Sequence, residues 1–280
     1  MVSPLFAPMP VECQLHVAMR WMHKTHPSAM PKARGVRDHR SGFFICEEPR
    51  VNRNWRNLMD EKMLIYSSGG KDSIMALYEA TTNPRYRQYT VSSLLTTLTE
   101  GYDRISGHGV RCSILEAQAA CLGMNVHKTY IPKGATMSDY EAVIEAALLK
   151  QKSQGTTTAA TGDIFIEKRR MATFKKTGIK GCFPLMQKNS YEHVSKFIDL
   201  GFKAYVVCVD SAALDQSYVG RAVDRTFLND LPSGVDPCGE HGEFHTFVFD
   251  GPIFRNQVKC RLGEVVFRES FYFRDVLLDD

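Results

Sequence analysis

A run of six residues combines the side chains that a phosphate site needs. It follows the apolar run MLIYS and opens KDSIMALYEATT, which has the pattern of a helix. A loop between a strand and a helix leaves backbone N–H groups free at the positive end of the helix dipole, where phosphate binds. The residues are Ser68, Gly69, Gly70, Lys71, Asp72 and Ser73.

The side chains of this loop are expected to contribute to phosphate binding in different ways. The two glycines allow the backbone to approach a ligand closely, and the two serine hydroxyls can donate to phosphate oxygens. Lys71 either adds positive charge or points to solvent. Asp72 would repel phosphate, so we expect it to hold Mg²⁺ or to cap the amides of the loop. The spacing differs from that of the kinase-type phosphate loop, G-x-x-x-x-G-K-[ST].

A second group of reactive side chains lies in GVDPCGEHGEFHTFVFDGPIF. Glu240 and Glu243 flank Gly242, and His245 begins a strand-like run. Such a cluster binds a metal or a cationic substrate or moves a proton, although a charged surface loop would look similar. We interpret Glu240, Glu243 and His245 as candidate catalytic residues. Cys238 fits a buried structural thiol better than a nucleophile.

Two smaller groups follow predicted strands. His108 and Arg111 come after the run YTVSSLLTT, and Gly162 and Asp163 stand at the end of the run TTTAATGD. The carboxyl ends of parallel strands form the ligand-binding edge of a doubly wound sheet, so these residues are candidates for contacting the nucleotide. Helix capping is the alternative role for both groups.

The elements that must position these residues alternate between strands and helices from residue 63 onward. This alternation predicts an α/β fold with a Rossmann-like, doubly wound parallel sheet. We expect helices at 137–155, with Ser138 as N-cap, and at 221–232. The end of the chain alternates as antiparallel strands do. The predicted division is an N-terminal extension over 1–62, a nucleotide-binding domain over 63–165, and a smaller α+β substrate domain over 166–280.

Charge is concentrated in the extension. Residues 1–62 hold ten Lys/Arg and six Asp/Glu, while the remainder holds 25 of each, so the body of the protein is neutral and nucleic acid is not an expected partner. The extension is a disordered tail, an accessory element or sequence upstream of a later start at Met59 or Met63. No C-x-x-C pair and no long apolar run occur, which predicts a cytoplasmic protein without a membrane span.

The loop SGGKDS resembles that of the N-type ATP pyrophosphatases. Six further segments resemble one branch of that group, the diphthine–ammonia ligase (diphthamide synthase) family, over about residues 63–275. They are EGYDRISGHGVR, EAQAACLG, GDIFIEKRR, GFKAYVVCVD, YVGRAVDRTFLNDLP and GVDPCGEHGEFHTFVFDGPIF.

The resemblance implies an adenine nucleotide alpha hydrolase-like fold, ATP and Mg²⁺ as cofactors, and an AMP-forming carbon–nitrogen ligase. A carboxylate would attack the α-phosphate of ATP, pyrophosphate would leave, and ammonia would displace AMP. In the family the acceptor is diphthine on elongation factor 2, if the host makes it. The resemblance also allows a homodimer. The alternatives are amidation or thiolation of another small molecule or tRNA, and a regulatory module that binds ATP without turnover.

Overall fold

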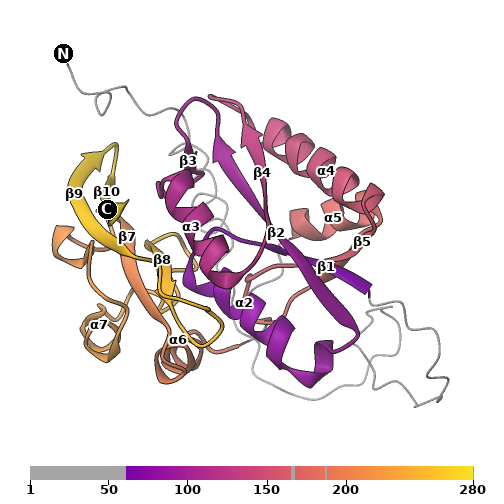
Figure 1. The fold of residues 1–280 in the computed structure, drawn as a ribbon. Coiled ribbons are helices and arrows are strands. Elements are labelled where there is room, and N and C mark those ends of the chain that lie inside the picture. Colours follow the sequence, from indigo (N-terminus) through magenta and orange to yellow (C-terminus); the bar gives the residue numbers. More distant parts are fainter. Residues whose placement is uncertain (1–60, 165–167, 187, 280) are drawn as a thin grey trace, which may run out of the picture.

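The computed structural model describes residues 61–164, 168–186 and 188–279. The extension predicted over 1–62 therefore lies almost wholly outside the described residues. Within them, no helix has the length and apolar character needed to cross a membrane. The chain builds two sheets of different kinds, which lie side by side with helices between them (Figure 1).

The first sheet is parallel except for one short strand. Its main path runs β3-β2-β1-β5-β6, and β4 pairs with the second half of β2. The strand β1 is central, because it pairs in parallel with both β2 and β5. The strands are β1 (Glu61–Tyr66), β2 (Tyr89–Thr99), β3 (Arg104–Ile105), β4 (Val126–Ile131), β5 (Thr156–Ala160) and β6 (Lys180–Cys182). The helical segments are α2 (Lys71–Thr82), η2 (Pro84–Tyr86), α3 (Cys112–Leu122), α4 (Met137–Ser153) and α5 (Lys168–Thr177).

Helices cover both faces of this sheet. On one side α4 and α5 pack over Leu64 of β1, while α2 and α3 lie on the other, between the two sheets (Figure 1). Met63 and Ile65 face α2. A central parallel strand is buried on both faces, which explains the unbroken apolar run that the sequence shows there. The prediction of a doubly wound, Rossmann-like sheet is confirmed.

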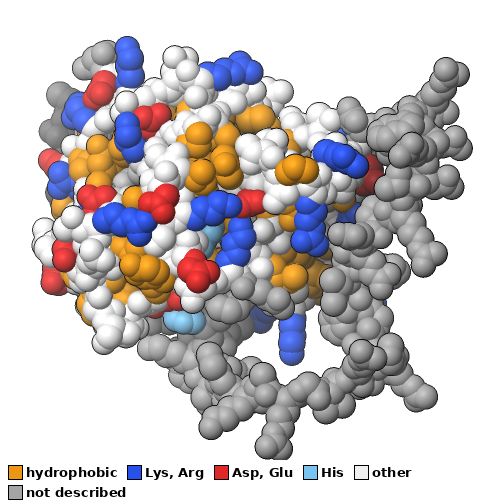
Figure 2. Space-filling model, turned by 90° about the horizontal axis from the view of Figure 1, so that it is seen from below, with side chains coloured by type: hydrophobic (Ala, Val, Ile, Leu, Met, Phe, Trp, Pro, Cys, Tyr) orange, Lys and Arg blue, Asp and Glu red, His pale blue; other side chains and the backbone are white. Residues whose placement is uncertain are grey.

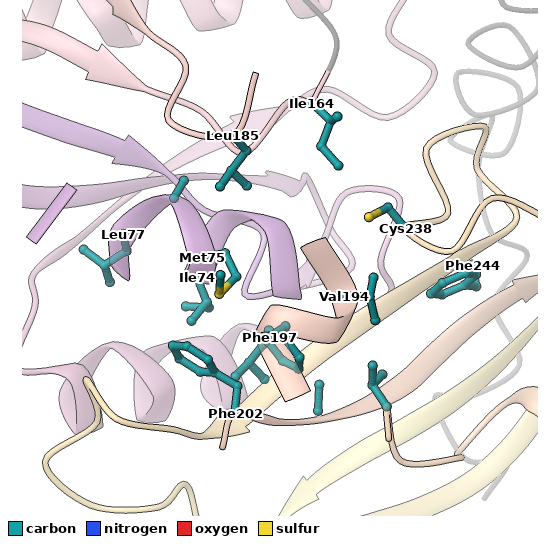
Figure 3. Packing of buried hydrophobic residues seen from close by; sticks show 14 of the residues in the cluster. Ile74, Met75, Leu77, Ile164, Leu185, Val194, Phe197, Phe202, Cys238 and Phe244 are labelled. Carbon is teal, nitrogen blue, oxygen red and sulfur yellow. The ribbon is translucent and has the colours of Figure 1, made fainter. Parts of the chain in front are cut away.

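The second sheet is antiparallel, in the order β8-β7-β10-β9. Its strands are β7 (Lys203–Asp210), β8 (Phe244–Asp250), β9 (Cys260–Arg268) and β10 (Phe271–Leu278), and its helical segments are α6 (Ser190–Asp199), η3 (Gln216–Tyr218) and α7 (Arg225–Asp230). One hydrophobic cluster includes side chains of α2, α6 and β8, so the two units share a core. Figure 3 shows Ile74 and Met75 close to Val194 and Phe197.

Three details differ from the sequence-based expectations. The strand β6 pairs with β5, so the parallel sheet continues past the boundary expected at residue 165. The N-cap of α4 is Thr136 rather than Ser138, because Thr136 and Asp139 form a reciprocal capping box. The helix predicted at 221–232 is only the six residues of α7. The residues at the start of the predicted range instead run alongside β7, where Val206 N donates to Arg221 O at 2.9 Å.

Candidate active site

The predicted phosphate loop, Ser68–Ser73, lies at the carboxyl end of β1, where the chain order across the sheet reverses. Ligands of doubly wound sheets bind at this position. Gly69 has a φ of 75°, a left-handed conformation that favours glycine. A Cβ at Gly70 would lie 3.0 Å from the carbonyl oxygen of Thr246, so a larger residue there would press on β8. The loop residues after Gly70 open α2, as the sequence predicts.

Strand β8 of the second sheet is hydrogen-bonded directly to this loop. Val248 N donates to Gly69 O at 2.9 Å, and Lys71 N donates to Thr246 Oγ1 at 3.0 Å. The buried amide of Gln118 on α3 joins the two, because its Nε2 donates to Gly69 O and to Val248 O. Two segments about 175 residues apart in sequence therefore form one hydrogen-bonded unit.

Lys71 is buried, with a side chain only 2% exposed, and it does not point to solvent. Its ammonium donates to Asp72 Oδ2 at 2.8 Å and to the carbonyl oxygen of Cys238, and it lies 5.3 Å from the centre of the Phe244 ring. Burial lowers the pKa of Lys71, but the carboxylate of Asp72 outweighs it and holds the pKa above its usual range. The positive charge of Lys71 is thus used inside the protein, between the loop and residues 236–246.

Asp72 is held from two sides and is still 27% exposed. Oδ2 accepts from Lys71, and Oδ1 lies 3.2 Å from Nε2 of His193 on α6. Burial raises the pKa of Asp72, but Lys71 and His193 outweigh that effect and lower it. Each carboxylate oxygen keeps a second lone pair, so the group can still coordinate a cation. Mg²⁺ is usually held by one or two carboxylates and the substrate phosphates, and Asp72 fits that role.

A softer metal is a poorer match for this place. Asp72, His193 and Cys238 offer oxygen, nitrogen and sulfur atoms that all lie within 4.8 Å of one another. The Cys238 thiol, however, donates to Ser190 O, and burial raises its pKa, which disfavours the thiolate that metals bind. The ammonium of Lys71 already places a positive charge beside Asp72.

The turn over residues 236–243 is held together by two carboxylates. Asp236 Oδ1 accepts from the backbone N–H of Cys238 at 2.8 Å. Glu243 accepts from Asp236 N through one oxygen and from His241 N through the other, at 3.1 and 2.9 Å. Glu243 is only 7% exposed. This bonding favours a role for Glu243 in shaping the turn over a role in proton transfer.

Glu240 differs from Glu243 although the two are three residues apart. Burial, together with the nearby charge of Asp72, raises the pKa of Glu240 to about 8, and Asp163 and Asp236 add to the effect. A carboxyl group that titrates near neutral pH can both give and take a proton, which suits general acid–base catalysis. The charges of the loop residue Asp72 and of Asp163 therefore act on Glu240.

The pair Gly162 and Asp163 borders the same site from the end of β5. A Cβ on Gly162 would lie 2.5 Å from the backbone carbon of Asp72, so this position needs glycine to let β5 approach α2. Asp163 Oδ2 accepts from Thr161 Oγ1 at 2.8 Å and lies 2.6 Å from Arg170 Nε. Asp163 therefore stands beside the phosphate loop, as expected for this edge of the sheet.

His108 and Arg111 both contact the second sheet. The ring of His108 lies 4.3 Å from that of His245 on β8, centre to centre. The contact brings together two candidate residues from separate segments of the sequence. Arg111 binds the carboxylate of Asp275 on β10 through Nε and Nη2, at 2.5 to 3.1 Å. Arg111 thus has a structural partner, which the sequence did not indicate.

Two polar residues of the site were missed in the sequence. Gln118 lies between Leu115 and Leu122 on the buried face of α3, and a polar residue at that position was a usable signal. His193 gave no such signal, because nothing in the sequence places α6 beside Asp72.

Comparisons with known proteins agree with this geometry. The family model described as "Diphthamide synthase N-terminal domain" matches residues 61–178, and the one described as "Diphthamide synthase C-terminal domain" matches residues 189–276. The human diphthine–ammonia ligase is 24% identical over 51% of this chain and 56% of its own length, and that of Schizosaccharomyces pombe is 22% identical over 53% and 25%. The chain thus spans about half the length, or less, of these curated relatives.

A solved structure from Methanocaldococcus jannaschii, titled as a predicted subunit of tRNA methyltransferase, covers 67% of this chain and 96% of its own. It is 14% identical with a TM-score of 0.34, which does not establish a shared fold.

In this chain the central strand of a parallel sheet leads into the loop SGGKDS. This arrangement is consistent with that of the PP-loop ATP pyrophosphatases. Both domain models match in chain order and together cover most of the described residues. The chain belongs to the diphthamide synthase family.

Proposed function

We propose that this protein is an ATP-dependent amide ligase that forms AMP. A carboxylate of the acceptor attacks the α-phosphate of ATP, pyrophosphate leaves, and ammonia then displaces AMP from the acyl-adenylate to give an amide. The observation that carries the proposal is the hydrogen bonding of β8 to the phosphate loop. It brings the only carboxyl group raised toward neutral pKa among the described residues, Glu240, next to the loop.

The loop residues Ser68–Ser73 have the binding role in this proposal. The N–H groups of Asp72 and Ser73 at the start of α2, together with the Ser68 hydroxyl, take the pyrophosphate side of ATP, which positions the α-phosphate for in-line attack. Asp72 would hold Mg²⁺, and that ion would neutralise charge on the phosphates. Lys71 keeps Asp72 and the carbonyl of Cys238 at fixed positions. Gly162 and Asp163 close the nucleotide site beside Asp72.

Proton transfer is assigned to Glu240. The attacking nitrogen must lose a proton, either from ammonium before attack or from the amine as the C–N bond forms, and a carboxylate beside the acyl group can take it. Glu243 supports this role by holding the turn that carries Glu240. His245 remains a proposed catalytic residue, and the contact of its ring with His108 places that pair where β8 meets the parallel-sheet unit.

The proposed acceptor is based on the names of the relatives. They are diphthine–ammonia ligases, so diphthine and ammonia are the substrates that we propose for this chain. The neutral charge of residues 63–280 favours a protein or small-molecule acceptor over tRNA. Figure 2 shows side chains of both charges interspersed with hydrophobic ones on the face viewed there.

The test is product analysis with ATP, Mg²⁺, ammonium and either diphthine-bearing elongation factor 2 or small carboxylic acids. We expect AMP and pyrophosphate, and with hydroxylamine in place of ammonia we expect a hydroxamate of the acceptor. Asp72→Asn should abolish the products. Asp215→Asn is the matched control, because Asp215 caps an exposed turn away from the loop. Formation of ADP, or tight ATP binding without turnover, contradicts the proposal.

A further inference from the structure

His193 is a buried polar residue with no assigned task. It lies in the first turns of α6 with its side chain fully buried. Its Nε2 is 3.2 Å from Asp72 Oδ1, a contact between residues 121 positions apart. Figure 3 shows its neighbours Val194 and Phe197 directed into the shared core.

Packing alone does not account for a histidine here. The second ring nitrogen, Nδ1, has no hydrogen-bond partner among the described residues. A buried polar atom without a partner destabilises the folded state, and an apolar side chain of similar size would avoid that cost. The one polar contact that offsets this cost is the one to Asp72.

The contact completes the fixation of Asp72. One carboxylate oxygen accepts from Lys71 and the other faces His193, so the plane of the carboxylate is set from both sides. The donor at this contact is the Nε2–H of His193, because a carboxylate oxygen accepts; the position of this hydrogen is assigned from its acceptor. Outer partners of this kind orient metal-binding carboxylates, and their loss typically lowers metal affinity about 10- to 100-fold.

We propose that His193 is a positioning residue that holds Asp72 in the orientation that receives the metal ion of metal–ATP. The inference rests on the proposed function, because it concerns the same site. It adds that the carboxylate of the phosphate loop is oriented from α6, an element of the second unit.

The experiment measures metal binding without turnover. Free Mn²⁺ is followed by electron paramagnetic resonance in the presence of a non-hydrolysable ATP analogue, with the wild-type chain, His193→Leu and His193→Gln. We expect Mn²⁺ affinity to fall about 10- to 100-fold in His193→Leu. His193→Gln should restore most of it, because its amide can donate to Asp72. Val194→Ala is the control, since it damages the same helix and core without touching Asp72.

Two results overturn the inference. One is wild-type Mn²⁺ affinity in His193→Leu. The other is a Gln variant that binds no better than His193→Asn, whose shorter amide cannot reach Asp72; this comparison also serves if His193→Leu does not fold. The proposed function fails separately, if wild-type protein binds Mn²⁺ with the analogue but never releases AMP from ATP.

Discussion

Charged side chains link the two units of the protein at several places, and two of these places differ in depth. The inner contact consists of Lys71, Asp72, His193 and the Cys238 carbonyl, with Lys71 2% exposed. The outer contact consists of Arg104, Arg111 and Asp275, with Arg111 39% exposed. Ion pairs in water contribute little to stability, whereas removing one partner of a buried pair leaves an uncompensated charge. The outer contact therefore adds to docking, and the inner contact fixes the geometry of the site.

The largest expected effect is at the inner contact. Lys71→Met removes the buried ammonium and leaves Asp72 Oδ2 and the Cys238 carbonyl without their donor. We expect the free energy of unfolding to fall by about 3 kcal/mol, measured with urea. Lys203→Met, at an exposed ion pair with Asp250, should change it by less than about 1 kcal/mol. Equal changes in the two variants would show that burial of Lys71 has no special energetic role.

Two glutamates near the inner contact have different proposed roles: Glu240 transfers a proton, and Glu243 holds the turn. Glu240→Gln should slow amide formation by roughly 10²- to 10⁴-fold while adenylation, followed by ATP–pyrophosphate exchange, changes much less. Glu243→Gln should weaken both steps together and lower stability by about 1–3 kcal/mol, because it disturbs two backbone hydrogen bonds. If Glu240→Gln slowed both steps equally, Glu240 would not be the base.

The pH dependence of hydroxamate formation tests the role of Glu240 as the base. Glu240 has its pKa raised to about 8, so the carboxylate that accepts a proton forms only as the pH rises through that value. Hydroxamate formation should increase between pH 7 and pH 9 with a midpoint at about 8, and hydroxylamine is suitable because it stays unprotonated over this range. This increase with pH should be absent in Glu240→Gln. The same shift makes the folded protein less stable as pH rises from the ordinary glutamate range toward 8, since the folded state binds the proton more tightly.

The smallest expected effect is at the outer contact. Asp275→Asn should lower the free energy of unfolding by about 1 kcal/mol at neutral pH and leave the KM for ATP unchanged. Arg111 and Arg104 outweigh burial and lower the pKa of Asp275, so its contribution is present above the ordinary aspartate pKa and is lost as the pH falls through the lowered value. The Asp275→Asn variant and the wild-type protein should therefore become equally stable in acid. A raised KM for ATP would instead tie Arg111 to the nucleotide.

The sequence predicted the parallel sheet well, because buried strands and amphipathic helices leave local patterns and Gly123 marks the end of α3 with a φ of 69°. It made the helix at 221–232 too long: the helix is confirmed over Arg225–Asp230, whereas the backbone at Arg221 pairs with β7. It also could not predict the partners of Lys71 and Arg111. Those partners depend on how β8 and β10 dock, which is a long-range property without a local signal.

The hydrogen bond from Val248 N to Gly69 O has a consequence for how the two substrates influence each other. Strand β8 lies in the unit that we propose binds the acceptor, and it is hydrogen-bonded to the loop that we propose binds phosphate, so a shift of one is transmitted to the other. If filling one site changes the affinity of the other by some factor, thermodynamic reciprocity requires the same factor in return. ATP affinity measured without acceptor and with saturating acceptor would then also report how much ATP raises the affinity for the acceptor.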